Sequence, residues 1–195
     1  MKGFNFVAIA LLSAQSALAC PVSGDLATGI RFGVDDGDFE TFRQMRPGVI
    51  ESTFVAADGT VYRNLLGQGI YLLEWTDIVE GKPDMDSRSV YAFAMTPETL
   101  PLPEPGGFAN LGVLVNAGGT LEQEMQMYSF GEATEITFGE CRYAMIPIEV
   151  RYAPDNGQGL TVLNYLPDLG LAYFTESTAN GQTDTYTYHS IEVVK

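Results

Sequence analysis

Residues 49–66, VIESTFVAADGTVYRNLL, form two runs rich in β-branched and aromatic residues on either side of a short polar turn. Val49–Val55 and Val61–Leu66 have the composition of strands, because branched and aromatic side chains fit a pleated, half-buried surface. The turn between them contains Asp58-Gly59, a pair that favours tight hairpins since glycine adopts the left-handed conformation at little cost. This stretch predicts an antiparallel hairpin.

Runs of the same kind recur from Ile30 onward, and clusters of Gly, Pro, Asn and Asp separate them. Connections this short cannot hold crossover helices, so neighbouring strands should be antiparallel. A sheet of about ten strands or more must curl or split in two. We therefore predict an all-β fold with little helix, either an antiparallel curled sheet, a half-barrel or a two-sheet sandwich. The further predicted strands are Ile70–Val79, Ser89–Met95, Leu111–Val115, Ala133–Phe138, Cys141–Tyr152, Leu160–Leu166, Leu171–Thr175 and Thr183–Val194.

Two segments leave the choice between helix and strand open. Thr120–Phe130 contains good helix formers at helical spacing, but Met125–Phe130 alternates as a strand does, and its neighbours favour a strand. Asp38–Met45 fits either a short helical turn or a strand. The Pro-rich segment 96–107, TPETLPLPEPGG, cannot be a central strand because proline lacks the N–H donor. We expect it to be a loop that crosses one face or one end of the β body.

Two glycine-containing segments resemble each other. Residues 67–75, GQGIYLLEW, are similar to residues 157–165, GQGLTVLNY, and a tyrosine precedes each at the same offset, Tyr62 and Tyr152. An ancient duplication would explain the similarity, and so would chance recurrence of a Gly-Gln-Gly turn before a buried strand. The sequence leaves both explanations open.

Residues 1–19 have the features of a secretory signal peptide. Lys2 supplies the positive end, Phe6–Leu12 is a short apolar run, and Ala17-Leu18-Ala19 offers small residues at the cleavage site. A buried N-terminal helix is the alternative. No later run approaches the roughly 20 apolar residues that a membrane helix needs, so we expect no transmembrane segment. The sequence thus predicts a single β domain at 20–195 that is periplasmic or secreted.

Cys20 would be the first residue of the exported protein, and Cys141 is the other cysteine of the chain. Oxidising compartments favour disulfides, so we expect Cys20 and Cys141 to be bridged. The alternative is a membrane-anchored lipoprotein, acylated on Cys20. Bacterial lipoprotein signals place Leu three residues before the modified cysteine, whereas Ala17 stands there in this chain. The two fates of Cys20 exclude each other.

The composition argues against nucleic acid or an anionic membrane as a partner, because both need a basic surface and this chain of 195 residues has a net charge of −15. Chemistry-bearing motifs are few. His189 is the single histidine, no Gly-x-Ser-x-Gly is present, and one histidine cannot build a zinc site. Acids gather at Asp35, Asp36 and Asp38 and at Glu80, Asp84 and Asp86, but neither group has the EF-hand spacing that calcium sites show. We assign no catalytic residue, no metal ligand and no cofactor.

The segment Tyr165–Leu171, YLPDLGL, which follows the Cys-bearing strand Cys141–Tyr152, resembles a segment of exported bacterial envelope proteins with a LolA-like β half-barrel. The resemblance covers about a quarter of the chain and carries over no site residue. It implies a protein that binds apolar ligands on a concave sheet.

Two classes of function remain. The first is a non-enzymatic envelope protein that binds a lipid, a peptide or a protein partner, with Met125, Met127 and Tyr128 as candidate lining of an apolar cavity. The second is a secreted hydrolase that uses His189 or paired carboxylates. The lack of a recognisable catalytic set favours the first.

Overall fold

The computed structural model describes residues 19–154, 159–179 and 181–195, so the predicted signal peptide lies outside the described part except for Ala19. The strands form one sheet in the order β14-β13-β12-β11-β9-β8-β7-β5-β4-β3-β2-β1-β15, with β10 paired to β11 and β6 paired to β5. The strands are β1 (Ile30–Val34), β2 (Phe39–Arg46), β3 (Val49–Val55), β4 (Val61–Gly67), β5 (Tyr71–Val79), β6 (Lys82–Pro83), β7 (Ser89–Phe93), β8 (Phe108–Ala117), β9 (Thr120–Phe130), β10 (Thr134–Phe138), β11 (Cys141–Ala153), β12 (Leu160–Leu166), β13 (Leu171–Ala179), β14 (Gln182–Thr185) and β15 (Tyr188–Val193).

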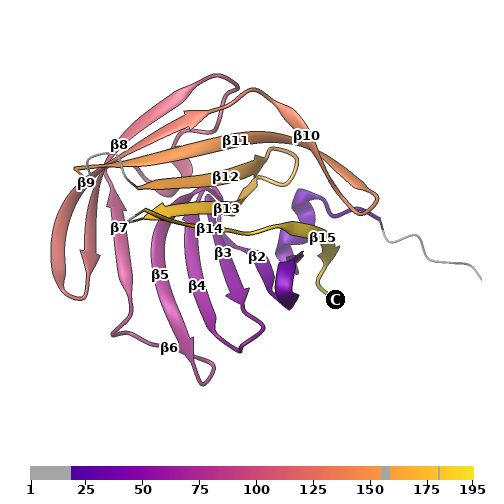
Figure 1. Ribbon diagram of the computed structural model, residues 1–195, viewed down its shortest axis with the longest axis horizontal. Helices are drawn as coiled ribbons and strands as arrows, with labels where there is room; N and C mark the ends of the chain where they lie inside the picture. Colours follow the sequence, from indigo (N-terminus) through magenta and orange to yellow (C-terminus); the bar gives the residue numbers. More distant parts are fainter. Residues whose placement is uncertain (1–18, 155–158, 180) are drawn as a thin grey trace, which may run out of the picture.

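The sheet is antiparallel and curls around an interior without closing into a barrel. Figure 1 shows β3, β4 and β5 on one side of this interior and β11, β12 and β13 on the other. Helix in the described residues is limited to the 3-10 turns η1 (Ser23–Ala27), η2 (Asp35–Gly37) and η3 (Pro97–Thr99). The prediction of an all-β curled sheet with little helix is confirmed, and the two-sheet sandwich is not what forms.

The two ambiguous segments are both strands. Thr120–Phe130 forms β9, in which Gln126, Tyr128 and Phe130 are buried while the residues beside them face outward. This period of two arises because β9 pairs with β8 on one edge and β11 on the other, so tertiary pairing outweighs helix propensity. Asp38–Met45 lies mostly in β2, after the short turn η2.

The predicted strand Thr183–Val194 is wrong in one respect, because it divides into β14 and β15. β14 pairs with β13, whereas β15 pairs with β1 at the opposite end of the strand order. The change occurs at adjacent residues: the Tyr186 amide donates to the Thr175 carbonyl, and the Thr187 carbonyl accepts from the Asp35 amide. No Gly or Pro stands at this break in the sequence. The strand divides because β13 and β1, with which its two halves pair, lie at opposite ends of the strand order.

Two buried clusters fill the interior. The first surrounds Phe32, whose ring lies 5.6 Å from Phe42, 5.3 Å from Phe138 and 5.7 Å from Tyr173, measured between ring centroids. The second contains apolar residues of β5, β9 and β11, among them Tyr71, whose ring lies 4.9 Å from that of Tyr128. Aromatic contacts of this kind add to the stabilisation that burial alone provides.

The turn between β4 and β5 touches the turn between β12 and β13 across the end of the curl. The Gly69 carbonyl accepts a hydrogen bond of 2.8 Å from the Ala172 amide. Gly69 has φ +68°, and a Cβ atom at this position would lie 2.5 Å from the Gly170 carbonyl oxygen. A glycine is therefore needed both for the backbone conformation and for the close approach of the two sides.

The Pro-rich segment 96–107 contains η3 and no strand, and it covers this same end of the sheet. Leu100 is 3% exposed and lies against Gly67. The Tyr71 hydroxyl donates a hydrogen bond of 2.6 Å to the Pro101 carbonyl. Side-chain burial and hydrogen bonding thus hold a segment whose prolines cannot join the ladder.

The predicted disulfide between Cys20 and Cys141 is present, with 5.4 Å between the Cα atoms. It ties the segment before η1 to the first residue of β11. Nearby, the buried Tyr143 hydroxyl donates a hydrogen bond of 2.9 Å to the Pro21 carbonyl. The N-terminal part of the described chain is therefore held to β11 by a covalent link and a hydrogen bond.

Candidate functional site

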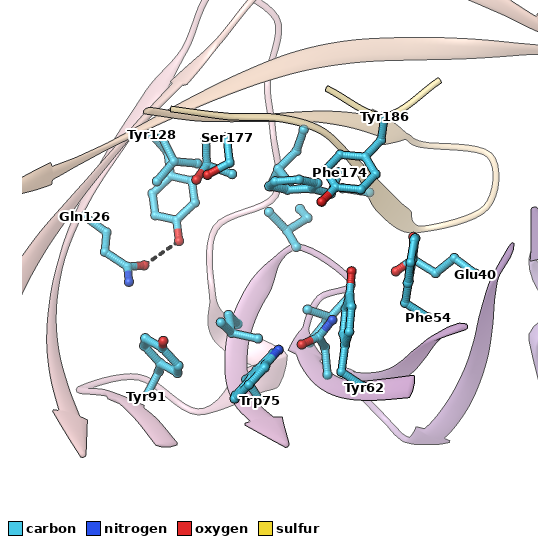
Figure 2. Close-up of a pocket in the computed structure, with 18 of the residues that line it drawn as sticks. Glu40, Phe54, Tyr62, Trp75, Tyr91, Gln126, Tyr128, Phe174, Ser177 and Tyr186 are labelled. Atoms are coloured by element: carbon cyan, nitrogen blue, oxygen red, sulfur yellow. Dashed lines mark hydrogen bonds between the residues drawn. The ribbon is translucent and has the colours of Figure 1, made fainter. Parts of the chain in front are cut away.

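A cavity of about 500 Å³ lies inside the curled sheet, between the two sides that meet at Gly69. Its volume falls in the range of small-molecule sites, which are mostly apolar with a few placed polar groups. Figure 2 shows its side chains pointing inward from opposite walls. The lining residues are Glu40, Phe54, Tyr62, Asn64, Leu66, Ile70, Leu72, Trp75, Tyr91, Glu124, Gln126, Tyr128, Val150, Tyr152, Thr161, Leu163, Ala172, Phe174, Ser177, Asp184, Tyr186 and Tyr188.

One wall is a row of aromatic side chains from neighbouring strands. Tyr62 of β4, Trp75 of β5 and Tyr91 of β7 lie along the lower part of Figure 2. The centroids of Tyr62 and Trp75 are 6.4 Å apart, and Tyr62 stacks on Phe54 of β3 at 4.9 Å. These residues share a face because alternate side chains of adjacent strands point to the same side of a sheet.

The opposite wall comes from the end of the chain. Phe174 and Ser177 project from β13, and Tyr186 follows β14 (Figure 2). The rings of Phe174 and Tyr186 lie 5.2 Å apart, and Tyr186 also meets Phe54 at 6.0 Å. Through these contacts the aromatic lining continues from one wall to the other.

Glu40 of β2 is a fully buried carboxyl at the cavity wall. It accepts a hydrogen bond of 2.5 Å from the Tyr188 hydroxyl and another from the Ser52 hydroxyl. Both donors are neutral, and burial raises the pKa of Glu40 against the opposing effect of these hydrogen bonds. Among the described residues, no Lys, Arg or His side chain forms an ion pair with the Glu40 carboxyl.

A short chain of hydrogen bonds runs along β9. The buried Tyr128 hydroxyl donates to the Gln126 side-chain oxygen at 2.6 Å, as the dashed line in Figure 2 marks. The Gln126 side-chain amide in turn donates to a carboxylate oxygen of Glu124 at 2.8 Å. Among the described residues, the second carboxylate oxygen of Glu124, which lines the cavity, has no side-chain donor.

The charged side chains of the cavity are all acidic: Glu40, Glu124 and Asp184 line it, and no Lys, Arg or His of the described residues does so. Arg63 of β4 and Arg88, which precedes β7, lie outside the cavity lining. Arg63 and Arg88 pair with Glu74 at 2.6 Å and 2.7 Å, and Glu74 precedes Trp75, so the two point to opposite faces of β5. Burial tends to raise the pKa of Glu74, but hydrogen bonds from Arg88 and Arg63 outweigh it and lower the pKa.

His189 does not reach the cavity. It follows Tyr188 on β15, and since Tyr188 lines the cavity, the His189 ring points outward and is exposed. The His189 Nδ1 lies 2.9 Å from the Gly33 carbonyl oxygen. Within the described residues, the structure does not bring this histidine together with the cavity carboxylates.

The acid clusters singled out in the sequence belong to turns. A carboxylate oxygen of Asp38 accepts a 2.8 Å hydrogen bond from the Ala57 amide, and Asp84 accepts one of 3.1 Å from the Asp86 amide. In the described part of the chain, no three His, Cys, Asp or Glu side chains are grouped so that they could hold a metal ion.

Of the candidate lining residues taken from the sequence, Tyr128 lines the cavity, whereas Met125 and Met127 do not. Met125 is 42% exposed because it lies on the outer face of β9. The aromatic residues Tyr62, Trp75 and Tyr91 were not anticipated. The signal for them was the alternation within each predicted strand, which indicates a shared face but not which face encloses a cavity.

No helix in the described ranges has the length and apolar character that crossing a bilayer requires. No known family model matches the chain, and no curated protein is detectably similar. Among solved structures, the chain is similar to the hypothetical lipoprotein YmcC from Escherichia coli (K12), with 10% identity and a TM-score of 0.44. The match covers 87% of this chain and 88% of that one. The resemblance to LolA-like half-barrels stays a prediction.

Proposed function

We propose that this protein is an exported, non-enzymatic envelope protein that binds a small ligand inside its curled sheet. The observation that carries the proposal is the cavity of about 500 Å³, to which both sides of the sheet contribute aromatic side chains. A pocket of this size buries most of the surface of a small ligand. Asp184, one of the lining residues, is exposed to solvent.

The placement of polar groups supports binding over hydrolysis. The Glu40 carboxyl is occupied by two hydroxyl donors, and Gln126 is held between Tyr128 and Glu124. A general base must instead reach the proton that it abstracts. His189, the histidine that a hydrolase would use near neutral pH, lies on the outer surface.

The test fills the cavity by one substitution. Ser177→Phe adds a phenyl ring inside, and Thr178→Phe adds the same ring at the next residue of β13, which does not line the cavity. Purified protein is titrated with the fluorescent apolar probe N-phenyl-1-naphthylamine. We expect the unsubstituted protein and Thr178→Phe to bind the probe, and Ser177→Phe to bind at least about ten times more weakly, a difference of about 1.4 kcal/mol. Equal binding by all three would exclude the cavity as the site.

Export is part of the same proposal, and the chemical state of Cys20 in the purified protein tests it. The signal-like residues 1–19 and the bond between Cys20 and Cys141 support an oxidising destination. Expressed in a bacterium that processes the signal, the protein should have the intact mass of residues 20–195 less two hydrogens. A mass raised by acyl chains would mean a membrane-anchored lipoprotein instead, because an acylated Cys20 sulfur cannot bond to Cys141.

A further inference from the structure

The cavity combines aromatic faces with carboxylates and lacks a positive side chain among its lining residues. We propose that its ligand is a small organic cation, a quaternary or alkyl-substituted ammonium compound. This inference rests on the proposed binding function and names the ligand class of that same cavity.

The aromatic lining supplies the first half of the recognition. Trp75 and Tyr62 stand side by side on one wall, and Phe174 and Tyr186 face them from the other. The face of an aromatic ring carries negative charge density, so it attracts a cation, most strongly where water is excluded. A ligand between these walls would meet ring faces on both sides.

The carboxylates supply the second half. Glu40 comes from β2, Glu124 from β9 and Asp184 from β14, so the acidic side chains surround the cavity and do not form one local cluster. An oxygen of Glu124 remains without a side-chain donor in the described residues. A cation in the cavity would attract these carboxylates and offset the cost of burying the charged form of Glu40.

The neighbouring tyrosines stay neutral and therefore keep their role as ring faces. Burial raises the pKa of Tyr91, and the Glu124 carboxylate raises it further. Burial and then Glu40 act in the same direction on the pKa of Tyr62. Near neutral pH these phenols add no charge of their own.

The same lining disfavours an anionic ligand. A fatty acid or a phosphate-bearing headgroup would bring negative charge next to Glu40, Glu124 and Asp184, with no described Lys, Arg or His in the lining to pair with it. The chain as a whole has a net charge of −15, which also attracts cations and repels anions. Among apolar ligands, cationic ones are therefore preferred.

The experiment compares two molecules of the same shape that differ in charge. Choline and its uncharged isostere 3,3-dimethyl-1-butanol are titrated separately into the disulfide-bonded protein. Trp75 is the only tryptophan and lines the cavity, so its fluorescence reports on occupancy, and calorimetry provides an independent affinity. We expect choline to bind at least about ten times more tightly than the isostere, equivalent to about 1.4 kcal/mol.

Charge-removing variants locate the effect. Asp184→Asn and Glu124→Gln should each weaken choline binding several-fold and leave binding of the isostere unchanged. Asp86→Asn removes the same charge from an exposed turn outside the cavity and should leave both affinities unchanged. An equal loss in Asp86→Asn would show that only the overall charge matters and would overturn the inference.

The outcomes separate this inference from the proposed function. If choline binds no better than its isostere, or not at all, while N-phenyl-1-naphthylamine still enters the cavity, the cation preference is wrong and the binding function stands. If none of these molecules binds and Ser177→Phe behaves as the unsubstituted protein does, both proposals fail.

Discussion

Glu40 is a buried ionisable group beside the ring of Tyr188, and burial disfavours its charged form. Its hydroxyl partners, Ser52 and Tyr188, come from strands far apart in the chain, so the carboxyl joins β2, β3 and β15. Because burial raises its pKa above the ordinary 4.5, the native state holds this proton more tightly than the unfolded state does.

Replacing this group tests the linkage between charge and stability. The contribution of Glu40 is fully present below pH 4.5 and is lost as the pH rises through its native pKa. Glu40→Gln carries no such charge, so its stability relative to the unsubstituted protein should increase between pH 4 and pH 7. Urea unfolding at both pH values measures the difference, and a difference independent of pH would contradict the prediction.

Gly69 is the residue at which the two sides of the sheet touch. Gly69→Ala should lower the free energy of unfolding by at least about 2 kcal/mol, since it adds both left-handed strain and a clash with the Gly170 carbonyl. Gly118→Ala is the matched control: φ there is +56°, but nothing lies within 4 Å of the added Cβ. If the two variants lose equal stability in urea unfolding, the close approach has no energetic weight.

At the level of elements, predictions from the sequence succeeded where local chemistry alone determines the strand. Val49–Val55 and Leu160–Leu166 were predicted with the bounds that the structure has, because polar or glycine-containing sequence flanks both runs. Thr183–Val194 failed at its middle, since Tyr186-Thr187 carries no turn signal and the break depends on which sheet edge lies nearby. Leu111–Val115 was too short because β8 extends along its hairpin partner β9.

The Pro-rich segment allows a comparison within one loop. Leu100→Ala should destabilise the protein by about 2–5 kcal/mol, because the removed atoms leave a space beside Gly67. Leu102→Ala deletes the same atoms from a side chain that is 53% exposed and should change stability by less than about 0.5 kcal/mol. Thermal or urea unfolding distinguishes the two, and similar losses would show that the loop is not anchored at Leu100.

At the scale of the whole molecule, the cavity is the feature that the sequence could not reveal. Its lining extends from Glu40 to Tyr188 and draws on strands of both sides, so no local motif encodes it. Tyr128 was correctly predicted as a lining residue, because the sequence analysis selected aromatic and methionine side chains for an apolar cavity. The predictions that Met125 and Met127 line the cavity were wrong, because a strand pattern does not indicate which of its faces turns inward once the sheet curls.

The disulfide closes a loop with a sequence separation of 121 residues. Loss of such a constraint on the unfolded chain should cost about 5 kcal/mol in the chain-entropy model. We expect the double variant Cys20→Ser/Cys141→Ser to unfold at a correspondingly lower urea concentration than the oxidised protein. Adding reductant to the unsubstituted protein should reproduce the loss, and an unchanged midpoint in both experiments would rule out this contribution.

The segment that divides into β14 and β15 also bears on the order in which the chain can fold. Ile30 of β1 is the register partner of Val193, so one of the earliest strands waits for one of the last. The neighbouring β14 completes β13 at the other edge. This topology gives a high contact order. Contacts so distant in sequence form slowly, because the entropy of loop closure is lost before the contacts contribute any stabilising free energy. When the chain becomes available from its N-terminus onward, β1 and β13 therefore remain unpaired edge strands until β14 and β15 can form.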